Sequence, residues 1–130
     1  MKQEQYIWID EDGNKRYYKD KAMTIYHRTD GPAGEYATGS KSWYVNGKLH
    51  RLDGPAFEWA DGSKSWYVNG ILHRLDGPAI EGATGHKSWC VDGEYLTENE
   101  FNDLSAPLEL TLEDIASKFG VDVSKVKIKA

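Results

Sequence analysis

The sequence has 130 residues and a net charge of −5, and its 39% of hydrophobic residues include 5 Trp and 8 Tyr. An acidic chain is not attracted to phosphate backbones or anionic lipid, which disfavours direct nucleic-acid binding and membrane binding. The single cysteine, Cys90, excludes an internal disulfide and a zinc site made of several cysteines. No apolar run is long enough to cross a membrane and the first residues lack a signal-peptide core, so we expect a cytoplasmic protein.

Residues 1–26 contain a degenerate copy of a unit that recurs later in the chain. The segment Asp12–Tyr18 parallels Asp61–Tyr67, although it reaches its histidine, His27, about three residues late. The terminal units of a repeat array have to cover its exposed ends. We therefore expect residues 1–26 to form an N-terminal repeat or cap, with the apolar run Tyr6–Ile9 at one end of the array.

Residues 27–96 hold three copies of a 23-residue unit, which begin at His27, His50 and His73. Each copy opens with the linker H-R-x-D-G-P-A and continues through two strand-like runs. In the second copy Asp61-Gly62 separates these runs, which predicts a hairpin with a two-residue turn whose central residues both have positive φ. Asn69-Gly70 predicts a further turn at the end of the second run, and each unit has a matching pair.

The assumed two-residue turn fixes which side chains share a face of the sheet. Trp59 would face Lys64, and Phe57 would face Trp66. The first face would carry an apolar stripe of Tyr36, Trp43, Val45, Phe57, Trp59, Trp66, Val68, Ile80, Trp89 and Val91. The second face would be mixed, with Glu35, Glu58, Glu81, Tyr44, Tyr67, Cys90, Ser42, Ser65 and Ser88. The predicted fold is mainly β: a single-layer, elongated antiparallel sheet of tandem hairpins with a small C-terminal α/β cap.

The 23-residue period, the W-Y-V-N-G-K segment, the G-P-A that opens each hairpin and the D-G turn resemble the MORN-repeat family over residues 5–96. The nearest likeness is to variant repeats of small bacterial and phage proteins. In that family the repeats form an extended curved sheet used for binding and dimerisation, and they are not enzymes. The resemblance therefore implies a binding module. The linker between hairpins differs from that of the commoner MORN repeats, because "G-K-L-H-R-L-D-G-P-A" replaces "G-K-x-H-G-x-G".

Residues 97–130 follow a different pattern. Thr97 and Glu100 form a capping-box signature, which predicts a helix from Thr97 to about Leu104. A second helix is predicted around residues 112–119, between short strands at 108–110 and 126–129. This segment, or a second copy of the chain, would cover the exposed end or the Trp face of the sheet.

The linker residues His50, Arg51 and Asp53 invite a search for a metal or catalytic site. Equivalent histidines would lie about 10 Å apart, two strand widths, whereas ligands of one ion lie about 2 Å from it. His50 with Asp53 offers only two ligands, so we predict no metal and no cofactor. Asp53 is expected to cap a turn, with Arg51 neutralising it. No catalytic motif is present, which predicts a protein that is not an enzyme, and Cys90 is expected to be a packed side chain.

The function we expect is a non-enzymatic module that binds a protein partner. Aromatic residues and arginine dominate interface energetics, so the repeating aromatic sheet offers such a surface. A finer expectation is a phage-encoded inhibitor of a host defence or nucleic-acid-processing protein, acting in the host cytoplasm. The alternatives are a self-associating scaffold, such as a homodimer, and a sponge for a small molecule or nucleotide. The candidate binding residues are Arg28, Arg51, Arg74, Glu35, Glu58, Glu81, Tyr44, Tyr67, Trp43, Trp66 and Trp89.

Overall fold

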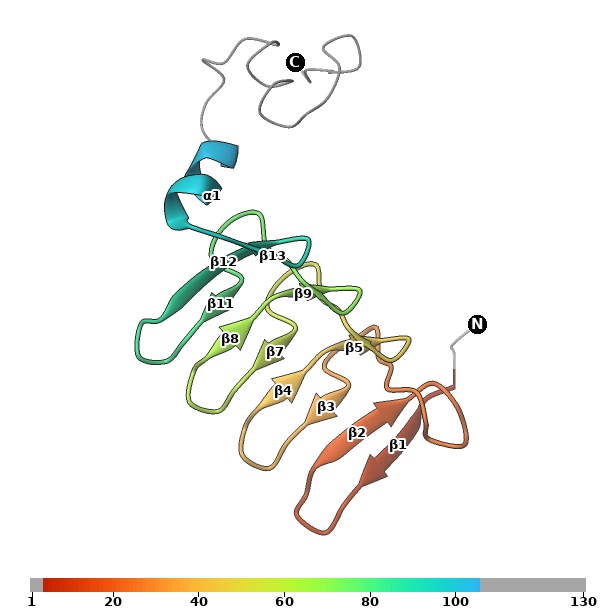
Figure 1. Ribbon diagram of the computed structural model, residues 1–130. Helices are drawn as coiled ribbons and strands as arrows, with labels where there is room; N and C mark the ends of the chain where they lie inside the picture. Colours follow the sequence, from red (N-terminus) through yellow and green to blue (C-terminus); the bar gives the residue numbers. More distant parts are fainter. Residues whose placement is uncertain (1–3, 106–130) are drawn as a thin grey trace, which may run out of the picture.

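The computed structural model describes residues 4–105 as a long, open antiparallel sheet of hairpins followed by one short helix (Figure 1). A 9-stranded sheet has the order β1-β2-β3-β4-β7-β8-β11-β12-β13, and the pairs β5–β6 and β9–β10 are separate two-stranded sheets. The strands and the helix are β1 (Tyr6–Ile9), β2 (Lys15–Tyr18), β3 (Gly34–Glu35), β4 (Lys41–Ser42), β5 (Tyr44–Val45), β6 (Lys48–Leu49), β7 (Phe57–Glu58), β8 (Lys64–Ser65), β9 (Tyr67–Val68), β10 (Ile71–Leu72), β11 (Ile80–Glu81), β12 (Lys87–Val91), β13 (Glu94–Leu96) and α1 (Glu98–Ser105).

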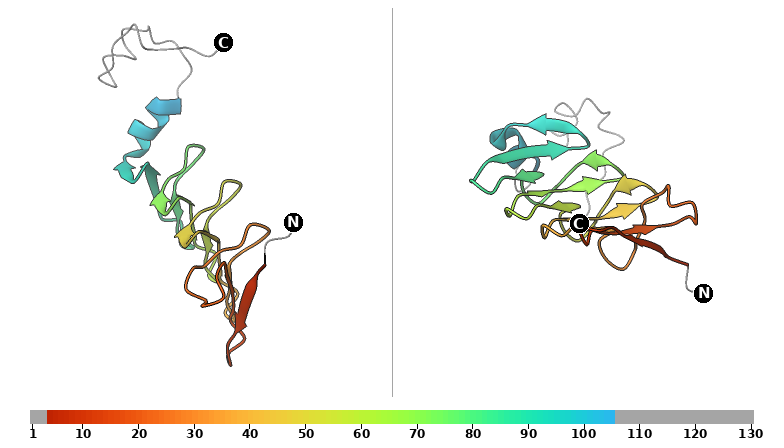
Figure 2. Two further views of the ribbon diagram at one scale, coloured as in Figure 1. Left: turned by 90° about the vertical axis from the view of Figure 1, so that its right-hand side faces the viewer. Right: turned by 90° about the horizontal axis from the view of Figure 1, so that it is seen from below.

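This arrangement confirms the predicted fold class of a mainly β, elongated antiparallel sheet of tandem hairpins. The hairpins stack along one axis, with β1 at one end and α1 at the other (Figure 2). Of the predicted C-terminal α/β cap, the first helix is described. The expected second helix and the two strands around it lie outside residues 4–105.

Each repeat contributes two hairpins that follow one another along the chain. The first hairpins, β3–β4, β7–β8 and β11–β12, form the long sheet. The second hairpins are β5–β6, β9–β10 and the pair of β12 with β13. Backbone bonds also join each second hairpin to the preceding unit, as in Gly70 N to Leu49 O and Gly93 N to Leu72 O. Every unit therefore depends on its neighbours for its backbone hydrogen bonds.

The second hairpins have the predicted two-residue turns. Asn69 and Gly70 have φ values of 51° and 79°, and they connect the paired residues Val68 and Ile71. Asn46-Gly47 and Asp92-Gly93 have the same conformation. Positive φ at both central residues is the requirement of a type I′ turn, which Asn-Gly and Asp-Gly satisfy best.

The two-residue turn predicted at Asp61-Gly62 is wrong, because the first hairpin has a three-residue loop. Trp59 N donates to Ser63 O at 2.9 Å, and Gly62 N donates back to Trp59 O at 3.0 Å. Gly62 has positive φ, at 94°, whereas Asp61 does not. A β-turn followed by a glycine in the left-handed region is the usual three-residue hairpin loop. It pairs Glu58 with Lys64, one residue away from the predicted register.

This shift by one residue redistributes the side chains between the two faces. Phe57 pairs with Ser65 instead of Trp66, so the predicted stripe that combined Phe57 and Trp59 with Trp66 and Val68 does not exist. One face, here the linker face, carries Trp43, Trp66, Val45, Val68, Glu35, Glu58, Glu81, Arg28, Arg51 and Arg74. The other, here the serine face, carries Ser42, Ser65, Tyr36, Phe57, Trp59, Tyr44, Tyr67 and Cys90.

The buried core is thin and consists mainly of small side chains. Ala33, Ala56 and Ala79 of the three linkers are fully buried. Cys90 is also fully buried and packs with Leu72, Ala79 and Tyr67 on the serine face. Burial raises the pKa of the Cys90 thiol, as expected for a packed side chain that is not activated as a nucleophile.

Helix α1 replaces the linker that a fourth repeat would have. Glu100 N donates to Thr97 Oγ1 at 3.1 Å, and Thr97 N donates to Glu100 Oε1 at 2.9 Å, which confirms the predicted capping box. These bonds lower the pKa of Glu100. Phe101 is buried, and the helix contacts β12 and β13. The helix thus covers the end of the array, where no further hairpin follows within the described residues.

Divergence between repeats leaves one hydroxyl without a partner, which provides a test of the register. Ser42 Oγ lies 3.1 Å from Tyr36 Oη. Trp59 occupies the place of Tyr36 in the next unit, and Ser65 Oγ is buried with no hydrogen-bond partner in residues 4–105. We expect Ser42→Ala to lower the free energy of unfolding by about 1 kcal/mol, and Ser65→Ala to leave it unchanged or raise it. Urea denaturation measures both, and equal losses would contradict the pairing.

Candidate binding face

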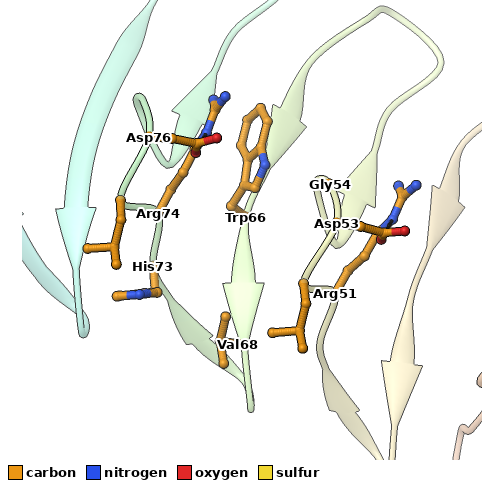
Figure 3. A pocket seen from close by; sticks show the side chains of 10 residues that line it. Arg51, Asp53, Gly54, Trp66, Val68, His73, Arg74 and Asp76 are labelled. Carbon is orange, nitrogen blue, oxygen red and sulfur yellow. Dashed lines mark hydrogen bonds and ion pairs between the residues drawn. The ribbon is translucent and has the colours of Figure 1, made fainter.

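The arginine of each linker is held by four contacts on the linker face, and Figure 3 shows Arg74 with two of its partners, Asp76 and Trp66. Arg74 donates from Nε to Asp76 Oδ1 at 2.8 Å, and from Nη1 to Pro78 O at 3.0 Å and to Glu81 Oε1 at 3.1 Å. Its guanidinium carbon lies 3.7 Å from the centroid of the Trp66 ring. Arg51 repeats all four contacts on Asp53, Pro55, Glu58 and Trp43, and Arg28 repeats them on Asp30, Pro32, Glu35 and Tyr17.

The glycine of each linker is required because the guanidinium lies directly against it. A Cβ atom at Gly77 would lie 2.8 Å from Arg74 Cζ, and one at Gly54 would lie 2.9 Å from Arg51 Cζ. Gly77 does not have positive φ, so the requirement is for space. The guanidinium is therefore packed between an indole ring on one side and glycine on the other.

The histidines serve the turns of the second hairpins. His27 Nδ1 accepts from Asn46 N at 2.9 Å, His50 Nδ1 from Asn69 N at 3.0 Å, and His73 Nδ1 from Asp92 N at 3.0 Å. As an acceptor, Nδ1 must be unprotonated in each of these bonds. Burial and the charge of Lys19 lower the pKa of His27, in agreement with this role.

Charges on the linker face alternate in sign across the long sheet. The register places Glu58 between Lys41 and Lys64, and Glu81 between Lys64 and Lys87. Opposite charges side by side on neighbouring strands stabilise a sheet. The same carboxylates accept hydrogen bonds from the linker arginines. Each glutamate is thus placed by the structure next to three cations.

The accessible charge of the linkers is negative. Only 18% of the Arg74 side chain is exposed, compared with 85% of Asp76. Arg51 and Asp53 show the same contrast, at 23% and 87%. The hydrogen bond from Arg74 lowers the pKa of Asp76 and keeps it ionised. A ligand on this face would therefore meet carboxylates at the rim and partly covered guanidinium groups beneath.

Two open grooves lie between successive linkers, one repeat apart. The first has a volume of about 580 Å³, and its walls include Trp66, Val68, Leu52 and Leu75. The second has a volume of about 600 Å³, with Trp43, Val45 and Leu52 at the equivalent places. Leu52 contributes to both grooves and is 80% exposed, and Leu75 is 65% exposed. The two leucines give the grooves apolar walls that are open to solvent.

The structure brings together only some of the candidate binding residues named from the sequence. The structure brings together the three arginines, their glutamates, Trp43 and Trp66 on the linker face. Tyr44 and Tyr67 lie on the serine face, so the expected surface of tyrosines beside glutamates is wrong. Trp89 has no stacked arginine within residues 4–105, because α1 follows in place of the linker. Sequence reasoning missed Leu52 and Leu75, although leucine between charged residues in a turn was a visible signal.

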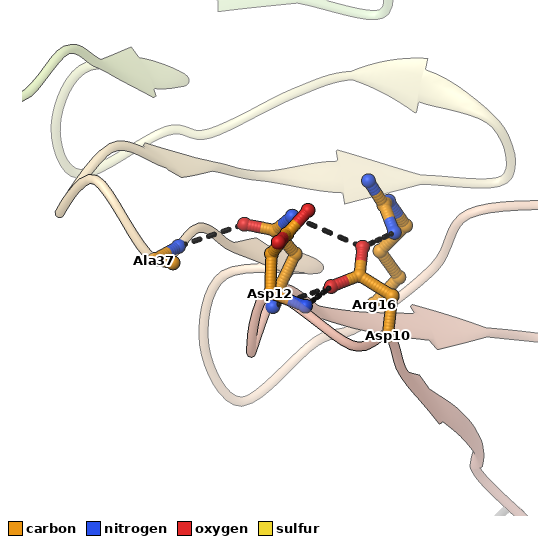
Figure 4. Close-up of polar contacts among 5 residues, drawn as sticks. Asp10, Asp12, Arg16 and Ala37 are labelled. Atoms are coloured by element: carbon orange, nitrogen blue, oxygen red, sulfur yellow. Dashed lines mark hydrogen bonds and ion pairs between the residues drawn. The ribbon is translucent and has the colours of Figure 1, made fainter.

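The N-terminal unit has a dense polar cluster of its own (Figure 4). Asp10 accepts hydrogen bonds from the backbone of Asp12 and from both the backbone and the side chain of Asn14, and it pairs with Arg16 at 2.9 Å. These contacts, of which the Asn14 side chain is the strongest, lower the pKa of Asp10 to about 2. Asn14 Oδ1 in turn accepts from Ala37 N at 2.8 Å, which joins the degenerate unit to the first full repeat.

Residues 4–105 contain neither a metal-binding cluster nor a helix that could span a membrane. No cluster of three or more His, Cys, Asp or Glu side chains there could hold a metal ion. Likewise, that part of the chain has no helix with the length and hydropathy to cross a membrane.

Comparisons with protein-family models, with curated proteins and with solved structures found no match to this chain. The resemblance to MORN repeats therefore stays a prediction from the residues of the repeat.

The packing of arginine against glycine predicts a substitution effect that depends on the arginine. Gly77→Ala should lower the free energy of unfolding by about 1–3 kcal/mol, because the new methyl group overlaps the guanidinium. In an Arg74→Ala background the same change should be neutral or stabilising, since alanine restricts the unfolded chain more than glycine does. A double-mutant cycle by urea denaturation measures the difference. An equal loss in both backgrounds would contradict the packing.

The histidine contacts predict a loss of stability in mild acid. The pKa of His27 is below its ordinary value of 6.5 in the folded protein, so the unfolded chain binds the proton more tightly. The corresponding stability is fully present above pH 6.5 and is lost as the pH falls through the folded-state pKa. His27→Gln should reduce the slope of the unfolding free energy between pH 7.5 and about 5.5. The exposed His86 provides the control, and an unchanged slope in His27→Gln would refute the assignment.

Proposed function

We propose that this chain is a non-enzymatic module that binds a protein partner through its linker face. The observation that carries the proposal is the pair of equivalent grooves, one repeat apart, that expose Leu52 and Leu75 beside Trp66 and Trp43. Interfaces take most of their energy from a few residues, among which tryptophan and arginine are enriched.

The rigidity of the linkers supports this proposal. Each arginine is fixed by its ion pairs, by a carbonyl and by the ring beneath it, so the groove walls are ordered before a partner arrives. Preorganised walls reduce the entropy that binding has to overcome. The polar groups of the linkers are bonded to one another in the same way in three units. This regularity favours a structural use of these groups over catalysis, which calls for an asymmetric set of residues.

The charge of the chain indicates the kind of partner. The net charge is −5, and the exposed carboxylates of Asp53 and Asp76 border the first groove. Electrostatic complementarity favours a basic protein surface. Proteins that process nucleic acids have such surfaces, so the finer form of the proposal is an inhibitor of a nucleic-acid-processing or defence protein.

A pull-down with matched surface variants tests the function. The double variant Leu52→Ser with Leu75→Ser removes the apolar groove walls, and both positions are too exposed for the change to affect the core. The control is Ile9→Ser with Tyr95→Ser, which are 62% and 68% exposed and lie at opposite ends of the array. We expect a protein from bacterial lysate that the wild type and the control capture and the groove variant loses. Equal capture by all three proteins, or no capture above background, would refute the proposal.

A further inference from the structure

The spacing of the two grooves restricts the shape of a ligand that occupies both. Equivalent strands of successive repeats, such as β4 and β8, are two places apart in the sheet. Two strand separations amount to about 9.6 Å. A ligand that places equivalent side chains in both grooves must therefore present the same face about every 9.6 Å.

Three regular backbone conformations can be compared with this period. An extended strand repeats a face every two residues, at about 6.6 Å and then about 13 Å. An α-helix repeats at about 5.4 Å and again, after seven residues, at about 10.5 Å. A polyproline II helix has three residues per turn and a rise of about 3.1 Å, which gives about 9.3 Å. The polyproline II period is the nearest match.

The indoles of the grooves offer the hydrogen-bond donor that such a ligand needs. A polyproline II backbone makes no internal hydrogen bonds, so its carbonyl groups remain free to accept. In Figure 3 the indole nitrogen of Trp66 lies on the side of Gly54, which also lines the groove. Within residues 4–105, the indole nitrogens of Trp43 and Trp66 make no hydrogen bond, and neither of them is a buried atom without a partner. Arg74 covers one side of the Trp66 ring.

The exposed carboxylates determine the charge of the ligand. Asp53 lines both grooves and Asp76 lines the first, and both side chains are more than four-fifths exposed. The Nε and Nη1 donors of Arg51 and Arg74 are already used within the protein. Lysine or arginine side chains that flank an apolar segment would therefore meet exposed carboxylates, whereas acidic side chains would be repelled.

We infer that the two grooves bind a proline-rich segment of the partner in the polyproline II conformation, with apolar anchors three residues apart and basic flanks. This inference rests on the proposed function, because it identifies the segment that the linker face recognises. Leu52, Leu75 and the two tryptophans form the anchor sites, the indole N–H groups donate to backbone carbonyls, and Asp53 and Asp76 bind the flanking cations.

The test uses three synthetic peptides and the full-length protein. The peptide KPLPPLPPLPK presents leucine at every third position, and KPLPLPLPPPK has the same composition with leucine at every second position. The peptide EPLPPLPPLPE reverses the charge of the flanks. We expect calorimetry to give at least about tenfold weaker binding, equivalent to about 1.4 kcal/mol, for the second and third peptides. In nitrogen-15 NMR spectra, the first peptide should shift the indole signals of Trp43 and Trp66 and leave that of Trp59 unchanged.

Matched variants separate groove binding from effects on folding. Trp66→Phe keeps an aromatic ring of smaller size and removes the indole N–H, and Trp59→Phe makes the same change on the serine face. Binding of KPLPPLPPLPK should weaken about tenfold in the first variant and remain unchanged in the second. Leu52→Ser, at an exposed position, should also weaken it.

The outcomes for the inference and for the function are distinct. Equal binding of the three peptides, no binding, or shifts confined to other indoles would overturn the inference. If KPLPPLPPLPK fails to bind while Leu52→Ser with Leu75→Ser still abolishes partner capture, the protein-binding function stands and the polyproline II inference falls. If the double variant retains capture, the function itself falls.

Discussion

The structure depends on one interaction that recurs in every unit: the linker arginine stacked on an aromatic ring. Arg51 joins the turn at Asp53, the carbonyl of Pro55, the strand residue Glu58 and the ring of Trp43. A sheet with one layer has no second layer against which to bury apolar side chains. The arginine compensates for this, because its stem and planar head cover the indole while its charge is neutralised locally. The linker therefore has the role that a hydrophobic core has in a two-layer domain.

The same constraint explains why the array needs special ends. Each interior unit forms hydrogen bonds and side-chain contacts with both neighbours. For example, Ala60 N donates to Ser40 Oγ of the preceding unit, and Ala83 N of the following unit donates to Ser63 Oγ. At one end α1 supplies Phe101 where the next linker would stand. At the other end β1 pairs only with β2 within the described residues, and Ile7, Trp8 and Ile9 remain exposed. An apolar edge strand of this kind pairs readily with other chains, which keeps self-association open as an alternative.

Much of the fold could be predicted from the sequence, because the informative signals were local. The Asn-Gly and Asp-Gly turns of the second hairpins and the Thr97 capping box depend on a few adjacent residues, and all were confirmed. The turn at Asp61-Gly62 could not be determined in this way. Glycine with positive φ occurs both in a two-residue turn and at the end of a three-residue loop. A shift of one residue in register moves every side chain of a strand to the opposite face. The predicted register therefore placed Glu58 on the same face as Tyr67, whereas the structure places it on the same face as Trp66.

The linker motif thus serves both the folding of the repeat and the surface that a partner would contact. Four residues of the motif have contacts within the protein. The histidine accepts a hydrogen bond from a turn, and the arginine stacks on an aromatic ring. The glycine gives space to the guanidinium, and the alanine is buried. The variable third position and the aspartate keep their side chains exposed, as Leu52, Leu75, Asp53 and Asp76, although each aspartate also accepts a hydrogen bond from its arginine. The first linker has Thr29 at the variable position, so the apolar wall is not needed for folding a unit. The features that a partner can meet are therefore the side chains that stay exposed in the folded repeat, and the repeat fixes the distance between them.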